Sequence, residues 1–194
     1  MALPSYDKSA RRKSFETLPK GAYVVKILEA KKERNKKNNG EHLKISFDIA
    51  EGEYANFYLQ QYKANTNENK EWPYDAVFRL NVPDDHSESY VYTNWNTFFA
   101  DLEDSNDGFV CTDEKKMKNK LIGGKFRIEQ SEYQGNVYDH TRLCWTCVAD
   151  DVRNGKAGKM PNDKLIGSFG STPAVNEGFM NIPDNLEDEG LPFN

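Results

Sequence analysis

The stretch HLKISFDIA, residues 42–50, decides the fold class of this chain. Within it Leu43, Ile45, Phe47 and Ile49 alternate with the polar residues between them. Alternation with a period of two is typical of a strand that buries one face against a core and turns the other to water. We therefore expect a mainly β protein in which this strand belongs to an antiparallel sheet.

The stretches on either side of this strand predict further strands. Residues 22–30 read as a strand buried on much of both faces, and residues 56–62 read as a third strand. Two more strands are expected over 121–131 and 137–149, around a turn at Gln134, Gly135 and Asn136. Residues 76–82 are either a short strand or part of an insertion.

One segment has helical spacing. Trp95, Phe98, Phe99 and Leu102 fall at i, i+3, i+4 and i+7, which predicts a helix over 94–104 with these side chains in the core. Thr93 or Asn94 is the expected N-cap.

Three strands, a helix and a final hairpin follow the element order of the OB-fold, a five-stranded antiparallel Greek-key barrel with one helix between strands 3 and 4. We expect this OB-fold-like body over residues 20–150, with an insertion around 63–92. Residues 1–19 are expected to form a basic flexible arm, and residues 151–194 a linker with a disordered acidic tail.

Charge is distributed unevenly along the 194 residues. Net charge is -5, but residues 8–37 hold eleven Lys or Arg against three Glu, whereas residues 177–194 hold five Asp or Glu and no Lys or Arg. An acidic tail therefore accounts for the acidic balance, and a basic region remains near the other end.

The composition also limits the class of protein. Three Cys do not make a disulfide framework, and neither a signal peptide nor an apolar stretch of membrane-spanning length is recognisable. We expect a cytoplasmic protein with no membrane partner.

Cations and aromatic residues gather where an OB-fold binds its ligands, on strands 2 and 3 and the loops joining strands 1–2 and 4–5. Basic side chains neutralise phosphates and aromatic rings stack on bases, so this combination is typical of a binder of single strands. The candidate nucleic-acid-binding residues are Lys31, Lys32, Arg34, Lys36, Lys37, Lys44, Tyr58, Tyr62, Trp72, Tyr74, Arg127, Tyr133, Tyr138 and Arg142. Two ordinary alternatives remain open. The expected basic loop at residues 31–40 is only a solvated surface, or several of the aromatic residues belong to the core.

The chain ends NLEDEGLPFN, an acidic cluster followed by Leu191, Pro192 and Phe193. This ending resembles the single-stranded-DNA-binding proteins of bacteria and phages, whose acidic linker carries a Pro-Phe tip that recruits replication and recombination proteins. The resemblance implies that Glu187, Asp188 and Glu189 steer a partner while Leu191, Pro192 and Phe193 dock. Asn194 departs from the pattern, because the family usually ends on the Phe and uses its carboxylate.

The body is also similar to proteins encoded by phages and mobile elements beside recombination genes. The stretches that carry this likeness are YLQQYKAN (58–65), WPYDAVFRLNVPDD (72–85) and IEQSEYQGNVYDHTR (128–142). We expect single-stranded DNA as the ligand, no strong sequence preference and no enzymatic activity. The sequence leaves open RNA as the ligand and a homo-oligomeric state.

Rival functions rest on weaker signals. Cys144 and Cys147, with His140 and Cys111, have the residue types of a zinc site, but residues three apart on a strand point to opposite faces. The acidic and His pairs at 84–86 and 139–140 lack the spaced carboxylates of a two-metal nuclease. We expect no metal and no cofactor. The remaining alternative is a β-barrel protein-interaction or phage assembly module that does not bind nucleic acid.

Overall fold

The alternating stretch forms strand β2 (Glu41–Ile49), as predicted. In this computed structural model, which describes residues 16–34, 40–84 and 89–167, the side chains of Leu43, Ile45, Phe47 and Ile49 are buried in the main core. His42, Lys44 and Ser46 on the other face are partly exposed. Asp48 is the exception, because its carboxylate is buried.

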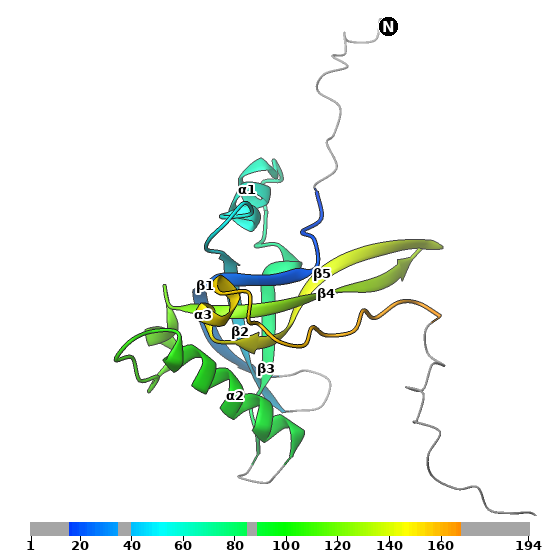
Figure 1. The fold of residues 1–194 in the computed structure, drawn as a ribbon. Coiled ribbons are helices and arrows are strands. Elements are labelled where there is room, and N and C mark those ends of the chain that lie inside the picture. Colours follow the sequence, from blue (N-terminus) through cyan, green and yellow to red (C-terminus); the bar gives the residue numbers. More distant parts are fainter. Residues whose placement is uncertain (1–15, 35–39, 85–88, 168–194) are drawn as a thin grey trace, which may run out of the picture.

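Four further strands complete the antiparallel sheet, and β2 itself pairs with two of them. The four are β1 (Gly21–Arg34), β3 (Val77–Asn81), β4 (Leu121–Tyr133) and β5 (Asn136–Cys147), in the order β3-β2-β1-β4-β5 (Figure 1). The prediction of a mainly β fold with five antiparallel strands is confirmed. Strands β3 and β5 are the two edges, and within the described residues no strand pairing joins them into a closed barrel.

Helix α2 (Tyr90–Asp104) lies between β3 and β4 in the chain and packs against β3, β4 and β5, which confirms the predicted helix. Phe98 and Leu102 are buried. The helix begins earlier than expected because the Ser89 hydroxyl caps it, accepting a hydrogen bond from the Tyr92 N–H at 3.2 Å.

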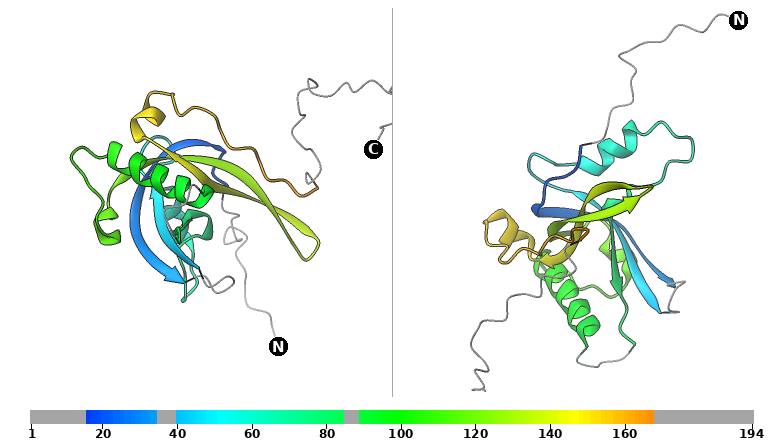
Figure 2. Two further views of the ribbon diagram at one scale, coloured as in Figure 1. Left: turned by 90° about the horizontal axis from the view of Figure 1, so that it is seen from below. Right: turned by 90° about the vertical axis from the view of Figure 1, so that its right-hand side faces the viewer.

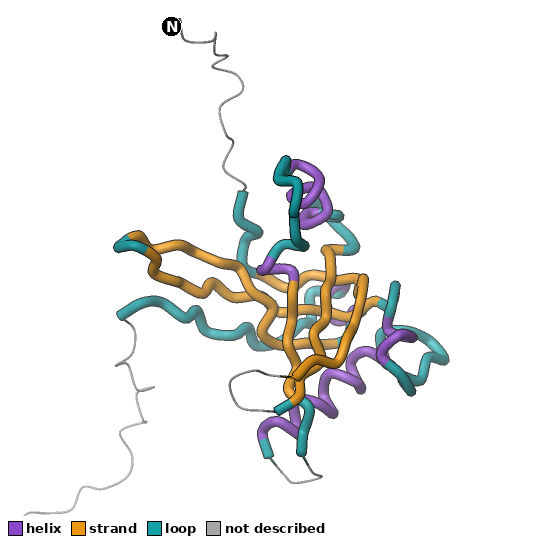
Figure 3. The backbone as a smooth tube through the Cα atoms, turned by 180° about the vertical axis from the view of Figure 1, so that it is seen from behind, coloured by secondary structure: helices purple, strands orange, loops and turns teal. Residues whose placement is uncertain are grey.

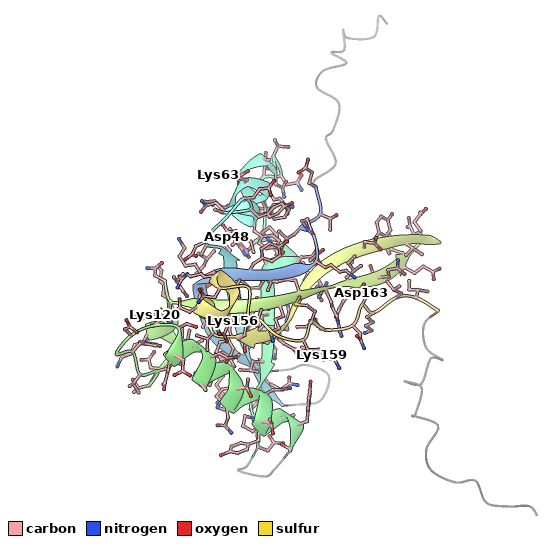
Figure 4. The ribbon with its side chains drawn as sticks, in the orientation of Figure 1. Asp48, Lys63, Lys120, Lys156, Lys159 and Asp163 are labelled. Carbon is pink, nitrogen blue, oxygen red and sulfur yellow. The ribbon has the colours of Figure 1, made fainter. Side chains whose placement is uncertain are left out.

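The predicted third strand at 56–62 is wrong, because these residues form helix α1 (Phe57–Ala64). The Asp48 carboxylate accepts hydrogen bonds from the N–H groups of Tyr58 (3.0 Å) and Leu59 (3.2 Å), in the first turn of the helix. A side chain on β2 thus accepts hydrogen bonds from the free N–H groups at the start of helix α1. Local hydrophobic periodicity does not reveal such a contact between distant residues. Figure 4 shows Asp48 below the start of α1.

The third strand is β3 instead, and it lies inside the stretch expected to be an insertion. Residues 63–92 therefore contribute to the sheet. Similarly, β1 extends to Arg34, so residues 31–34 of the expected loop are strand, paired with residues 41–44 of β2.

Packed structure extends past both expected boundaries of the body. Leu18 is buried, and the Thr141 hydroxyl donates a hydrogen bond to its carbonyl oxygen. Beyond β5, helix α3 (Ala149–Arg153) begins with a fully buried residue. The chain then runs beside the β4–β5 hairpin, where Lys164 exchanges backbone hydrogen bonds with Ile128 and Gln130 of β4 (Figure 2).

Asp163 fixes this last segment to the sheet (Figure 4). One carboxylate oxygen accepts a hydrogen bond from the Ile128 N–H at 3.0 Å, and the other pairs with Lys20 at 2.6 Å. These contacts lower the pKa of Asp163, the hydrogen bond from Lys20 most of all.

Candidate nucleic-acid interface

A row of cations crosses the outward face of three neighbouring strands. The strand register sets Lys31 of β1 opposite Lys44 of β2, and Lys44 opposite Arg79 of β3. Directly opposed residues share a face of the sheet, so the three side chains lie side by side. We call Lys31, Lys44 and Arg79 the cation row.

Tyr74 links the cation row to the last two strands. It lies in the short 3-10 helix η2 (Tyr74–Ala76), immediately before β3. The Arg142 guanidinium lies 4.0 Å from the centre of its ring and the Arg79 guanidinium 5.3 Å from it. The ring is 58% exposed. Hydrogen bonding to Arg142, and the charge of that residue, lower the pKa of Tyr74.

The β4–β5 hairpin carries the next part of the surface. In the strand register Arg127 lies opposite Arg142, and Ser131 lies opposite Tyr138, so these four side chains share one face of the hairpin. Tyr133 is two residues beyond Ser131 and lies on the same face. Tyr133 is 64% exposed and Tyr138 is 47% exposed. The hairpin projects beyond the rest of the sheet (Figure 3).

The turn at the hairpin tip holds this register. Gln134 and Gly135 both have positive φ, 51° and 75°, as a two-residue type I′ turn requires. The predicted turn is confirmed.

Acidic residues hold several of these cations in place. Lys44 lies 3.6 Å from Glu33, Arg142 lies 3.5 Å from Asp75, and Arg127 lies 2.5 Å from Glu129. Burial alone raises the pKa of Glu129, but the hydrogen bond from Arg127 and the charges of Arg127 and Arg142 outweigh it and lower that pKa. Lys31 and Arg79 have no ion pair within the part of the chain that the structure describes.

A hollow of about 360 Å³ lies over the cation row. We call it the front groove. Its lining combines the three cations with Trp72 and Tyr74, and it also includes Glu29, Glu33 and Glu71. The groove thus presents aromatic rings and cations together, with carboxylates that already neutralise part of the charge.

Two of the predicted basic residues point elsewhere. Lys32 and Arg34 alternate with Lys31, so they lie on the opposite face of β1, where Lys32 pairs with Glu41 at 2.5 Å. Lys36 and Lys37 lie outside the described residues, as do Glu187, Asp188, Glu189, Leu191, Pro192 and Phe193.

Three predicted stacking residues pack or form hydrogen bonds within the protein. Tyr58 is 2% exposed and packs edge-on against Phe47, so it belongs to the core, and burial strongly raises the pKa of its hydroxyl. The Trp72 indole N–H donates a hydrogen bond to the Phe47 carbonyl at 3.2 Å. Tyr62 packs against Trp72 with the ring centres 5.6 Å apart, and Lys70 lies 4.8 Å from its ring centre.

Sequence reasoning missed Arg79. The sequence left residues 76–82 as either a short strand or part of an insertion, although Phe78 and Leu80 alternate with Val77 and Arg79. That short alternation is the signal that marks Arg79 as an outward cation.

The remaining titratable groups near the hairpin have protein partners. His140 lies between the Asp75 carboxylate (3.2 Å) and the Ser131 hydroxyl (2.9 Å). Burial raises the pKa of Cys144 to about 11, and Cys147 is buried near α3. Among the described residues no three His, Cys, Asp or Glu side chains are grouped as metal ligands.

Comparison with known proteins gives one match. Residues 5–82, less than half of the chain, match a family model described as "Protein of unknown function (DUF669)". No curated protein matches the chain. Within the described residues, none of the helices combines the length and apolar composition needed to cross a bilayer.

Proposed function

We propose that this protein binds single-stranded DNA in the cytoplasm without strong sequence preference and catalyses no reaction of its own. The observation that carries the proposal is Tyr74, an exposed aromatic residue in contact with both Arg79 and Arg142. It joins the cation row to the aromatic face of the hairpin. A run of cations and exposed rings along one face is what a sequence-tolerant strand binder needs.

The carboxylates on this face favour binding of single-stranded over duplex DNA. Phosphates must displace Glu33, Asp75 and Glu129 from their cations, so charge alone gives little affinity. Base stacking on Tyr74, Tyr138 and Tyr133 supplies the remainder, at about 1–3 kcal/mol per stacked base. Bases in a duplex are already stacked and do not offer their faces, so single strands are preferred.

Adjacent lysines on β1 provide a matched test. Lys31 belongs to the cation row, whereas Lys32 has the same charge on the opposite face. We expect Lys31→Ala to weaken binding of a labelled oligo-dT and to reduce the magnitude of the salt slope by about 0.7, the value for one phosphate contact on a single strand. Lys32→Ala should leave both quantities unchanged. Equal effects of the two substitutions would contradict the assignment of the face.

The hairpin tyrosines provide a second test. Because Tyr133 and Tyr138 are largely exposed, replacing both with Ala should leave the Tm nearly unchanged. We expect the affinity for oligo-dT to fall roughly 5- to 150-fold per base unstacked. Unchanged affinity in a folded double variant would exclude the hairpin from the interface.

The second part of the proposal concerns partners. The acidic Pro-Phe ending supports recruitment of replication or recombination proteins, since an apolar tip flanked by carboxylates suits an apolar pocket rimmed by Lys and Arg. Phe193→Ala should retain DNA binding and lose association with purified replication or recombination proteins on DNA, measured by interferometry. Association that survives Phe193→Ala and Pro192→Ala would contradict this role.

A further inference from the structure

A second hollow opens between helix α2 and the two edge strands of the sheet. Its volume is about 460 Å³, within the size range of small-ligand sites. We call it the edge pocket. The lining residues that bear on its chemistry are Arg79, Asn81, Tyr90, Asn94, Lys125 and Trp145.

The edge pocket has an open aromatic wall. Trp145 is 40% exposed and Tyr90 is 73% exposed. One exposed ring is ordinary on a protein surface, but two rings that line one pocket offer flat faces to a ligand.

Polar groups of suitable types surround these rings. Lys125 is paired in register with Trp145, so its ammonium group shares the outward face of the hairpin with the indole. Asn81 and Asn94 each offer an amide donor and acceptor, as the edges of a nucleobase require. The nearby Asp101 carboxylate accepts a hydrogen bond from Thr146 at 2.6 Å.

A β-bulge sets Trp145 in this position. The pairing of β4 with β5 shifts between Lys125 and Phe126, which leaves Cys144 as the extra residue on β5. Trp145 consequently lies opposite Lys125, two residues from Arg127 on the same face of β4. Bulges commonly re-aim a side chain beside a functional site.

The edge pocket and the front groove adjoin at Arg79, which lines both hollows. From Arg79 one direction leads to Tyr74 and Lys44, and the other leads to Tyr90 and Trp145. A single strand in the front groove would pass beside Arg79, where the edge pocket begins.

We infer that the edge pocket is a nucleobase-binding subsite for single-stranded DNA, in which a base stacks on Trp145 while Lys125 contacts its phosphate. This inference rests on the proposed function. It adds Trp145, Tyr90 and Lys125 to the interface and makes the footprint longer than the front groove.

The test compares affinities across a series of oligo-dT lengths, from about 4 to about 20 nucleotides, the range of site sizes for such folds. With the full chain, Trp145→Ala should bind the shortest oligonucleotides like the wild type. Its affinity should fall roughly 5- to 150-fold for oligonucleotides long enough to reach the edge pocket, which corresponds to one stacked base. Trp145→Phe keeps an aromatic face and should restore most of the loss.

The outcomes separate the subsite from the proposed function. If the wild type binds and Trp145→Ala matches it at every length, the edge pocket is not a DNA subsite, while the front groove remains one. An equal loss of affinity in Trp145→Ala at every length would also contradict the inference, because the edge pocket would then not extend the front groove. If the wild type binds no length at all, both proposals fail together.

A second measurement does not depend on substitution. Long oligonucleotides carrying 5-iododeoxyuridine should photocrosslink to Trp145 or Tyr90, and mass spectrometry of the peptides would identify the site. Crosslinks confined to the hairpin tip and the front groove would overturn the inference.

Discussion

Asp48 connects strand β2 of the sheet to the first turn of helix α1 through hydrogen bonds. Its buried carboxylate accepts three backbone hydrogen bonds, from Ile49 at 2.9 Å, Tyr58 at 3.0 Å and Leu59 at 3.2 Å. Removing the acceptor leaves those N–H groups unsatisfied, and a buried unsatisfied group costs about 1–3 kcal/mol.

We expect Asp48→Ala to lower the free energy of unfolding by roughly 2–4 kcal/mol, because it removes both a helix cap and a set of buried acceptors. Denaturant unfolding measures the loss. Asp48→Asn is the matched control, since its amide oxygen preserves one acceptor, and it should lose less than the Ala variant. Equal losses of stability in the two variants would show that the hydrogen bonds to Asp48 do not account for the destabilisation.

Asp48 also predicts a pH dependence. Burial raises its pKa and outweighs the backbone hydrogen bonds that lower it. Between the usual Asp pKa and this raised value, the folded protein holds a proton that the unfolded chain has released. The free energy of unfolding of the wild type relative to Asp48→Asn should therefore decrease as pH rises through that acidic window. A relative increase across the same window would contradict the raised pKa.

Among the elements, strand β4 depends on Gly123 for its close packing. A Cβ atom at Gly123 would lie 2.7 Å from Cys147 Sγ, 2.8 Å from the Cys147 carbonyl oxygen and 2.8 Å from a Val152 methyl group. The backbone atom cannot move as the end of a flexible side chain could, so the approach of β5 and α3 to β4 requires the absence of a side chain.

We expect Gly123→Ala to destabilise the protein by about 1–3 kcal/mol through overpacking, lowering the Tm in calorimetry. Gly52→Ala is not a suitable comparison because its φ is 81°. An exposed substitution with no such contact, Glu132→Ala, is the better control and should shift the Tm little. If the Gly123 variant were as stable as this control, the packing account of α3 on β4 would be wrong.

The elements also show how far the sequence could predict the fold. Strand β2 was predictable because one face of it is buried, which imposes a period of two. Helix α1 was not, since its cap is Asp48, several residues away along the chain and on another element. Strand β1 extends to Arg34 despite its charges because residues 41–44 pair with it.

The candidate site was predictable in composition but not in arrangement. The sequence indicated Tyr74, Lys44 and the hairpin tyrosines, whereas only the register separates Lys31 from Lys32 and assembles the cation row. Trp145 could not be assigned to a face from alternation, because the bulge at Cys144 changes the phase of β5.

At the scale of the whole molecule, charge is separated along the chain. Residues 177–194 contain five acidic residues and no basic ones, while the cation row and Arg142 lie on the body. We therefore expect the tail to compete electrostatically with DNA for the surface that we propose binds it.

We expect deletion of residues 177–194 to tighten binding of oligo-dT at low salt and to have no effect at high salt, where such attraction is screened. Replacing the five acids in this segment with Asn and Gln, at constant length, is the control and should reproduce the effect. Affinity that does not change at low salt in either variant would exclude competition by the tail.

Fluorescence anisotropy of a labelled oligo-dT at several salt concentrations, with single-stranded and duplex competitors, tests whether the protein binds single-stranded DNA. We predict binding that single strands displace and duplex does not. Because carboxylates already pair with part of the interface, the salt slope should be shallow, roughly -1.4 to -3, as for two to four phosphates on a single strand. No binding even at low salt, or equal displacement by duplex, would contradict the account.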